Sequence, residues 1–277
     1  MGELVYHYCS FATFKKILEN PKLRFTDITK SDDRYEISYL WNSIVNYIGQ
    51  KTKSELNKKI FEYEIKNQYK VSTHLVTCFS EDSDSLLLWK MYADGGVSLG
   101  FDKDYLCKLS KKILILNNQV IISEDNDNGC VCKFGEVNYI AQYDIKKYLE
   151  ENFSNIGWGL ESFGDFFACA PFTKTSFWKE EKEWRLVISL IRNDAEIKDY
   201  NQIVNICNVK NIDMCLEKNR GFETVLSCYV PFDKNAIKSI VIAPNNNIEE
   251  KEVCFLLEKN GFNINEVEIK KSLGSLR

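Results

Sequence analysis

The chain has 277 residues, of which 44% are apolar and 13% aromatic, and its formal net charge is −4. This apolar content is sufficient for a large hydrophobic core, which excludes a disordered protein. The slightly acidic balance gives no overall field that attracts nucleic acid, although it leaves room for a local basic groove. Apolar runs are shorter than the roughly 20 residues that span a bilayer, and the first residues lack a signal-peptide pattern. We therefore expect a cytoplasmic protein without a membrane partner.

The N-terminal residues predict a strand, a helix and a second strand. Residues 4–8 are β-branched and aromatic, as in strands, and apolar side chains then recur at helical spacing over 11–18. Ser10 is a suitable N-cap for this helix. Asn20-Pro21 ends it, because proline disfavours the α conformation in the preceding residue, and residues 23–25 resume an extended chain.

The middle of the chain predicts helices and strands in alternation. Two amphipathic helices over about 35–70 form an insertion, because apolar residues recur there every three to four positions. The patterns that follow predict a strand at 75–79, a helix at 86–93, a strand at 97–101, two short strands within 113–122, a strand at 131–139, and helices at 144–152 and near 160–170.

The last part of the chain contains its most strand-like run. We expect a polar loop over 173–181, then a central strand at 184–191. Further strands are expected at 224–230, at 237–242 and near Val267, with a helix at 249–259. Strands separated by helices without a regular β-α-β alternation favour an α+β fold of mixed, mainly antiparallel sheets with inserted helices, in a single domain over 1–277.

Several common site types lack their motifs. The ten cysteines are scattered, and the closest pair, Cys130 and Cys132, has one intervening residue rather than zinc-ligand spacing. There are only two histidines, His7 and His74, and His74 opens a buried-looking strand, where a structural role is expected. Phosphate-binding glycine loops of the P-loop or dinucleotide-binding type are absent. We expect no metal cofactor.

The densest ionic feature is the segment KEEKEWR over 179–185. Strand alternation would place Glu181, Glu183 and Arg185 on one face. Neighbouring carboxylates raise the proton affinity of at least one member, and a nearby arginine opposes this, so such a pair can supply a base or a hydrogen-bonding carboxylate. The alternative is a solvated charged loop.

Four strings together resemble a widespread bacterial family of unknown function, domain-of-unknown-function family 2971. They are VYHYCSFATFKKILENPKLRF, SDDRYE, TCFSEDSDSLLLWKMYADGGVSLGF and FWKEEKEWRLV, in the family order. Departures are Asp32 for the family's Asn, Arg34 for its Pro and Leu88 for the Met before the helix tryptophan.

The opening string also resembles ADP-ribosyltransferase-like domains, which use NAD as substrate. The resemblance implies that His7 holds the NAD ribose, that Tyr8 or Tyr92 stacks on nicotinamide, and that Glu183 is the catalytic glutamate. Glu181 would assist the acceptor, as in the Glu-x-Glu loops of arginine-type transferases.

The resemblance further implies where the rest of the dinucleotide is held. Arg24, Lys174 or Arg185 would meet the pyrophosphate, and Ser10 and Trp89 would lie in the same cofactor-binding region. The implied protein is a mono-ADP-ribosyltransferase or NAD glycohydrolase of toxin or phage-defence type that acts on a macromolecular acceptor. A toxin of this type would have an antitoxin or other regulatory partner.

Two other functions stay open at this point. The first is a non-catalytic nucleotide-sensing or interaction module on the same fold. The second is a nucleic-acid-binding or nucleic-acid-modifying protein, in which Phe177 and Trp178 stack on bases beside Lys174 and Lys179.

Overall fold

The computed structural model describes residues 2–30, 40, 42–43, 46–47, 55, 59, 62–63, 72–116, 119–122, 132–141, 143–153, 169–191, 213–218, 224–244 and 246–274. The expected helical insertion at about 35–70 falls largely outside these residues, as does most of the helix expected near 160–170. Within the described part, no helix combines the length and apolar character needed to cross a bilayer.

The N-terminal strand, helix and strand are confirmed as β1 (Leu4–Cys9), α1 (Phe11–Glu19) and β2 (Lys22–Asp27). Ser10 caps α1, because its hydroxyl accepts a 3.2 Å hydrogen bond from the Thr13 amide. The helix buries Phe14, Ile17 and Leu18 on one side, as its periodicity predicts.

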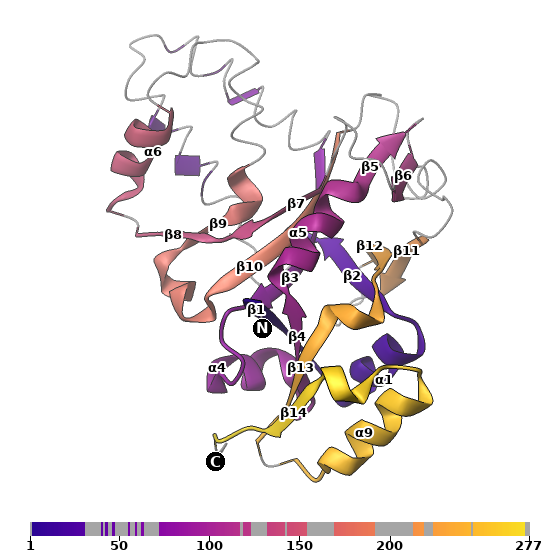
Figure 1. The fold of residues 1–277 in the computed structure, drawn as a ribbon. Helices are drawn as coiled ribbons and strands as arrows, with labels where there is room; N and C mark the ends of the chain where they lie inside the picture. The colour runs from indigo at the N-terminus through magenta and orange to yellow at the C-terminus, as the bar shows by residue number, and fades with distance from the viewer. Residues whose placement is uncertain are drawn as a thin grey trace.

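A ten-stranded sheet organises the described residues (Figure 1). Eight strands follow the order β11-β12-β2-β3-β1-β4-β13-β14, while β10 pairs with β3 and β7. All pairs are antiparallel except β13 with β14. The remaining bounds are β3 Ser72–Ser80, β4 Val97–Asp102, β7 Cys132–Glu136, β10 Glu183–Ile191, β11 Asp213–Lys218, β12 Thr224–Pro231, β13 Ile237–Ile242 and β14 Glu268–Lys271. The expected mixed, mainly antiparallel architecture is confirmed.

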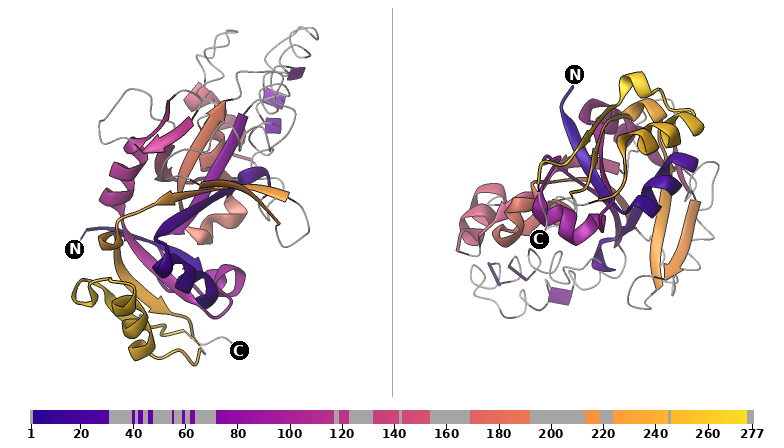
Figure 2. Two further views of the ribbon diagram at one scale, coloured as in Figure 1. Left: turned by 90° about the vertical axis from the view of Figure 1, so that its right-hand side faces the viewer. Right: turned by 90° about the horizontal axis from the view of Figure 1, so that it is seen from below.

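The sheet divides at β3. Strand β10 pairs along the whole of one edge of β3, whereas the other edge meets β1 at Ser80 and β2 at Val76 and Leu75. Strands β1 and β2 therefore part on either side of Cys78, and we refer to this place as the fork. One arm continues through β4, β13 and β14, and the other through β12 and β11, as Figures 1 and 2 show.

Helices complete the core of the sheet. They are α1, α5 (Lys103–Lys112), α9 (Glu250–Lys259) and α4 (Leu86–Leu88), which continues as a π-helical turn over Trp89–Ala93. A further helix is α6 (Ile145–Phe153). The main core joins one face of the sheet to α1, α5 and α9, and a smaller cluster surrounds Trp89. Gly96 allows the chain to pass close to β1, because a Cβ atom there would lie 2.1 Å from the Cys9 carbonyl oxygen.

Three local expectations differ from the structure. The segment expected as a polar loop over 173–181 forms β9 (Thr173–Thr175) and a 3-10 helix over Ser176–Glu181. The strand expected at 131–139 is divided into β7 and β8 (Asn138–Ile140), and β8 pairs with β9 in parallel. Strand β11 was not expected. The two short strands within 113–122 are confirmed as the hairpin β5 (Ile113–Leu116) and β6 (Gln119–Ile122).

Candidate functional site

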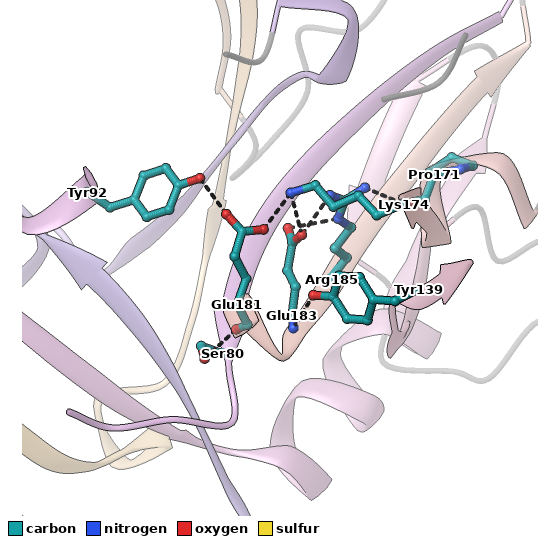
Figure 3. A network of polar contacts seen from close by, with 8 residues as sticks. All are labelled: Ser80, Tyr92, Tyr139, Pro171, Lys174, Glu181, Glu183 and Arg185. Carbon is teal, nitrogen blue, oxygen red and sulfur yellow. Dashed lines mark hydrogen bonds and ion pairs between the residues drawn. The ribbon is translucent and has the colours of Figure 1, made fainter. Parts of the chain in front are cut away.

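Two glutamates and two cations form a buried ionic cluster where the chain enters β10 (Figure 3). The Lys174 Nζ atom donates to Glu181 Oε2 at 2.6 Å and to Glu183 Oε2 at 3.1 Å. Arg185 donates from Nε to Glu183 Oε1 and from Nη2 to Glu183 Oε2, both at 2.8 Å. All four residues are buried. Because two positive charges meet two negative charges, the cluster is formally neutral.

Strand geometry and one left-handed residue bring the two carboxylates together. Glu183 and Arg185 lie two residues apart on β10 and therefore project from the same face, as predicted. Glu181 ends a 3-10 helix rather than belonging to the strand, and Lys182, with φ of 45°, turns the chain between the two glutamates. Glu181, Glu183 and Arg185 lie on one side, as expected. For Glu181, however, the cause is the turn at Lys182 and not strand alternation.

The two glutamates have pKa values shifted in opposite directions. Burial raises the pKa of Glu181, and Glu183 adds to this, while Lys174 and the hydrogen bonds lower it by less. Burial also acts to raise the pKa of Glu183, but Arg185 and Lys174 outweigh it and hold that pKa below its ordinary value. Glu183 is thus a persistent carboxylate, and Glu181 is the group that takes up a proton more readily.

Tyrosines and a serine fix the backbone and rim of the cluster. The Tyr92 hydroxyl donates to Glu181 Oε1 at 2.9 Å. Because Tyr92 is 40% exposed, it lies between the buried carboxylates and the solvent. The Tyr139 hydroxyl accepts from the Glu183 amide at 2.8 Å, and the Ser80 hydroxyl donates to the Glu181 carbonyl at 2.7 Å. Each carboxylate oxygen of Glu181 and Glu183 accepts at least one hydrogen bond.

His7 does not join this cluster. Tyr6 and Glu183 both pair with Ser80 and project from one face of the sheet, which places His7 on the opposite face, beside Phe79 in the main core. The His7 Nδ1 atom lies 3.0 Å from the Cys78 carbonyl oxygen, at the place where β1 and β2 part. The single NAD site that the resemblance implies for His7 and Glu183 therefore does not form, because the two side chains lie on opposite faces of the sheet, and His7 instead satisfies the backbone at the fork.

Four other residues expected to bind the cofactor have structural roles in different parts of the fold. Tyr8 is buried, its hydroxyl donates to the Asp82 carbonyl, and its ring meets Trp89 edge-on, so it offers no open face for stacking. Trp89 is buried, and Ser10 is the cap of α1. Arg185 is 1% exposed and bonded to Glu183 and the Pro171 carbonyl, so it has no surface for a pyrophosphate.

Arg24, on β2, belongs to a second group of polar side chains, with Glu217 and Ser227. Its Nη2 atom lies 2.7 Å from Glu217 Oε2 and donates to Ser227 Oγ at 3.3 Å. Tyr92 and Arg24 are thus the expected cofactor-binding residues that retain exposed surface beside a carboxylate. Lys174, one of the residues proposed for phosphate or nucleic acid, is committed to the two glutamates, whereas Phe177 is 82% exposed.

The sequence interpretation missed three contributors to the site. The sequence predicts Lys174 as a phosphate-binding residue rather than as the cation between the carboxylates. It points neither to Tyr139 nor to the Cys78 thiol, which helps to lower the pKa of Glu183. Tyr139 and Lys174 meet because β8 and β9 pair in register, a contact that spacing along the chain does not encode.

Within the described residues, no group of three or more His, Cys, Asp or Glu side chains is arranged to hold a metal ion.

The segment that carries the ionic cluster also matches a protein-family signature. The sequence signature of the family described as "Protein of unknown function (DUF2971)" matches residues 88–186. This match supports the resemblance to that family. It includes Tyr92, Tyr139, Lys174 and the segment from Glu181 to Arg185, and so covers the ionic cluster. No curated protein and no solved structure matches the chain.

Proposed function

We propose that the ionic cluster acts on the N-glycosidic bond of NAD, as a mono-ADP-ribosyltransferase or an NAD glycohydrolase. The observation that carries this proposal is the pair of buried carboxylates that share Lys174 and have oppositely shifted pKa values. Glycosidic chemistry uses two carboxyl groups whose surroundings give one the role of an anion and the other the role of a proton carrier.

In this mechanism Glu183 supports the positive charge that develops on the ribose. The bond between C1′ and the nicotinamide nitrogen breaks with its electron pair passing to nicotinamide, which leaves as a neutral molecule. The ribose then carries an oxocarbenium-like charge, which a preorganised carboxylate stabilises. For Glu183 to engage the ribose, the 3.1 Å bond from Lys174, the longest of its bonds to the two cations, is the one to yield.

Glu181 takes the proton released by the acceptor. An acceptor hydroxyl, amine or water forms the new bond to C1′, and its proton passes to Glu181, whose raised pKa suits a general base. The half-exposed ring of Tyr92, held by its bond to Glu181, provides the stacking surface for nicotinamide. The products are nicotinamide and either an ADP-ribosylated acceptor or free ADP-ribose.

The test is nicotinamide release from NAD by the purified protein, with and without a bacterial lysate as the source of acceptor. We expect Glu183→Gln to reduce release roughly 100-fold or more. Glu180→Gln is the matched control, because Glu180 is exposed and lies in the same segment. Circular dichroism would establish that both variants fold. Intact NAD under all conditions, or equal release by Glu183→Gln, would overturn the proposal.

A non-catalytic nucleotide-binding module is the second candidate. It is favoured by the internal neutrality of the cluster and by the donors that already satisfy both carboxylates. A module of this kind would be stabilised by NAD or ADP-ribose without consuming them. A rise in the melting temperature with NAD, together with unchanged NAD after long incubation, would select this alternative.

A further inference from the structure

The fork opens the middle of the sheet to solvent at Cys78. Cys78 is exposed although β3 is a central strand, and its neighbours on the same face, Val76 and Ser80, are 6% and 3% exposed. On one side of Cys78, its register partner Arg185 and the adjacent Glu183 belong to the ionic cluster. Solvent therefore reaches the sheet directly beside Glu183, on the face from which Glu183 projects.

Arg24 lies on the other side of Cys78. Thr26 pairs with Val76, so Arg24, two residues earlier on β2, projects from the same face as Val76 and Cys78. The Thr77 hydroxyl donates to the Arg24 carbonyl at 2.7 Å, which holds this part of β2 next to Cys78. Arg24 and Arg185 thus lie on strands at opposite edges of β3, to either side of this exposed residue.

The contacts of Arg24 leave half of its guanidinium available. Both polar contacts that the side chain makes with described residues, to Glu217 and Ser227, use Nη2. No described residue accepts from Nε or Nη1, and the side chain is 44% exposed. Glu217 is itself held by the Tyr229 hydroxyl at 2.5 Å. The guanidinium is therefore fixed in orientation while two of its nitrogens can serve a ligand, a preorganised arrangement suited to phosphate oxygens.

We propose that a phosphate-bearing ligand lies over Cys78, with its phosphate on Arg24 and its ribosyl end toward Glu183. The identification of this ligand as a dinucleotide rests on the function proposed above. In this arrangement Cys78 is the floor of the binding site, Arg24 is the phosphate-binding residue, and Glu217 and Tyr229 are positioning residues that orient Arg24.

The test uses Cys78 as a reporter of occupancy and ADP-ribose as the probe. The full chain is treated with N-ethylmaleimide, and alkylation of Cys78 is followed by mass spectrometry of its peptide. We expect saturating ADP-ribose to slow the alkylation of Cys78 at least tenfold, and Arg24→Gln to remove this protection at the same ligand concentration. Lys251→Ala, at an exposed lysine on α9, is the matched control and should keep the protection.

A second probe separates loss of phosphate recognition from loss of folding. Nicotinamide riboside, which has no phosphate, should bind Arg24→Gln and the unaltered protein equally. Three results would overturn the proposal: no alkylation of Cys78 in the ligand-free protein, no protection by ADP-ribose, or equal protection in Arg24→Gln. Protection that depends on Arg24 without any NAD consumption would support this site while rejecting the chemistry assigned to Glu183.

Discussion

Glu183 and Arg185, two residues apart on β10, form a two-point ion pair in the protein interior. Both contacts measure 2.8 Å, and Arg185 is 1% exposed. A third donor of Arg185, Nη1, reaches the Pro171 carbonyl at 2.5 Å. The arginine therefore joins β10 to the segment that carries Lys174, and it ties the stability of the fold to the charge of the candidate catalytic glutamate.

Removal of the arginine charge should destabilise the protein strongly. Arg185→Gln leaves Glu183 buried with Lys174 as its remaining cation, and loss of one partner of a buried pair costs about 3–5 kcal/mol. Urea unfolding at neutral pH measures this loss, and Glu180→Gln should stay within about 0.5 kcal/mol of the unaltered protein. The double variant Glu183→Gln/Arg185→Gln should lose less than the sum of the two single changes. Additive losses would show that the pair is not coupled.

The left-handed backbone at Lys182 should favour glycine. Lys182 has φ of 45°, a conformation that costs a residue with a Cβ atom roughly 1–2 kcal/mol. Lys182→Gly and Lys182→Ala both remove the 3.8 Å contact with Asp82, so a comparison of the two isolates the backbone effect. We expect the glycine variant to be more stable by about 1 kcal/mol in thermal or urea unfolding. The same pair of changes at Lys179, inside the 3-10 helix, should give the reverse order; a less stable Lys182→Gly would contradict the prediction.

His74 should make the protein less stable as the pH falls from neutrality. Burial, opposed in part by Asp27, lowers the pKa of His74 from 6.5 to about 4. The neutral imidazole of the folded state contributes its stability above pH 6.5, and this is lost as the pH falls toward 4, because the unfolded chain takes up the proton first. The expected loss is about 3 kcal/mol.

The measurement is the free energy of unfolding at intervals from pH 7 to pH 4. His74→Gln should be less stable at pH 7, because it also changes the 2.9 Å contact with Ser189, but its stability should fall less steeply. The difference between the two curves isolates His74 from the carboxylates and from His7, whose pKa is also lowered. Parallel curves would mean that His74 does not titrate in this range.

Tyr92 should tune the proton affinity of Glu181. Its hydrogen bond favours the ionised carboxylate, so Tyr92→Phe should raise the pKa of Glu181 further. If Glu181 is the general base, the acidic limb of the pH profile for nicotinamide release then moves to higher pH. Tyr143→Phe, at a tyrosine that is 86% exposed, is the control and should leave the profile unchanged. A lower rate with an unmoved profile would assign Tyr92 to substrate binding alone.

The sequence alone determined most of the local structure. The strand at Leu4–Cys9, the cap at Ser10, the helix Phe11–Glu19 and the strand Glu183–Ile191 follow from side-chain periodicity and capping chemistry, which depend on residues close in the chain. The same local geometry placed Glu183 and Arg185 on one face. Segments with weak periodicity were interpreted less well, as the strand and 3-10 helix over Thr173–Glu181 show.

Only the tertiary structure decided which face of the sheet each residue shares with its distant neighbours. His7 and Glu183 lie on opposite faces because Tyr6, rather than His7, stands in register with Ser80, and a shift of one residue reverses every side chain of a strand. Lys174 meets Glu181 and Glu183 through a left-handed turn at Lys182. Arg24 projects from the same face as Glu183 because Thr26 stands in register with Val76, as Glu183 does with Ser80. Register and strand order are set by long-range packing, which no local pattern specifies.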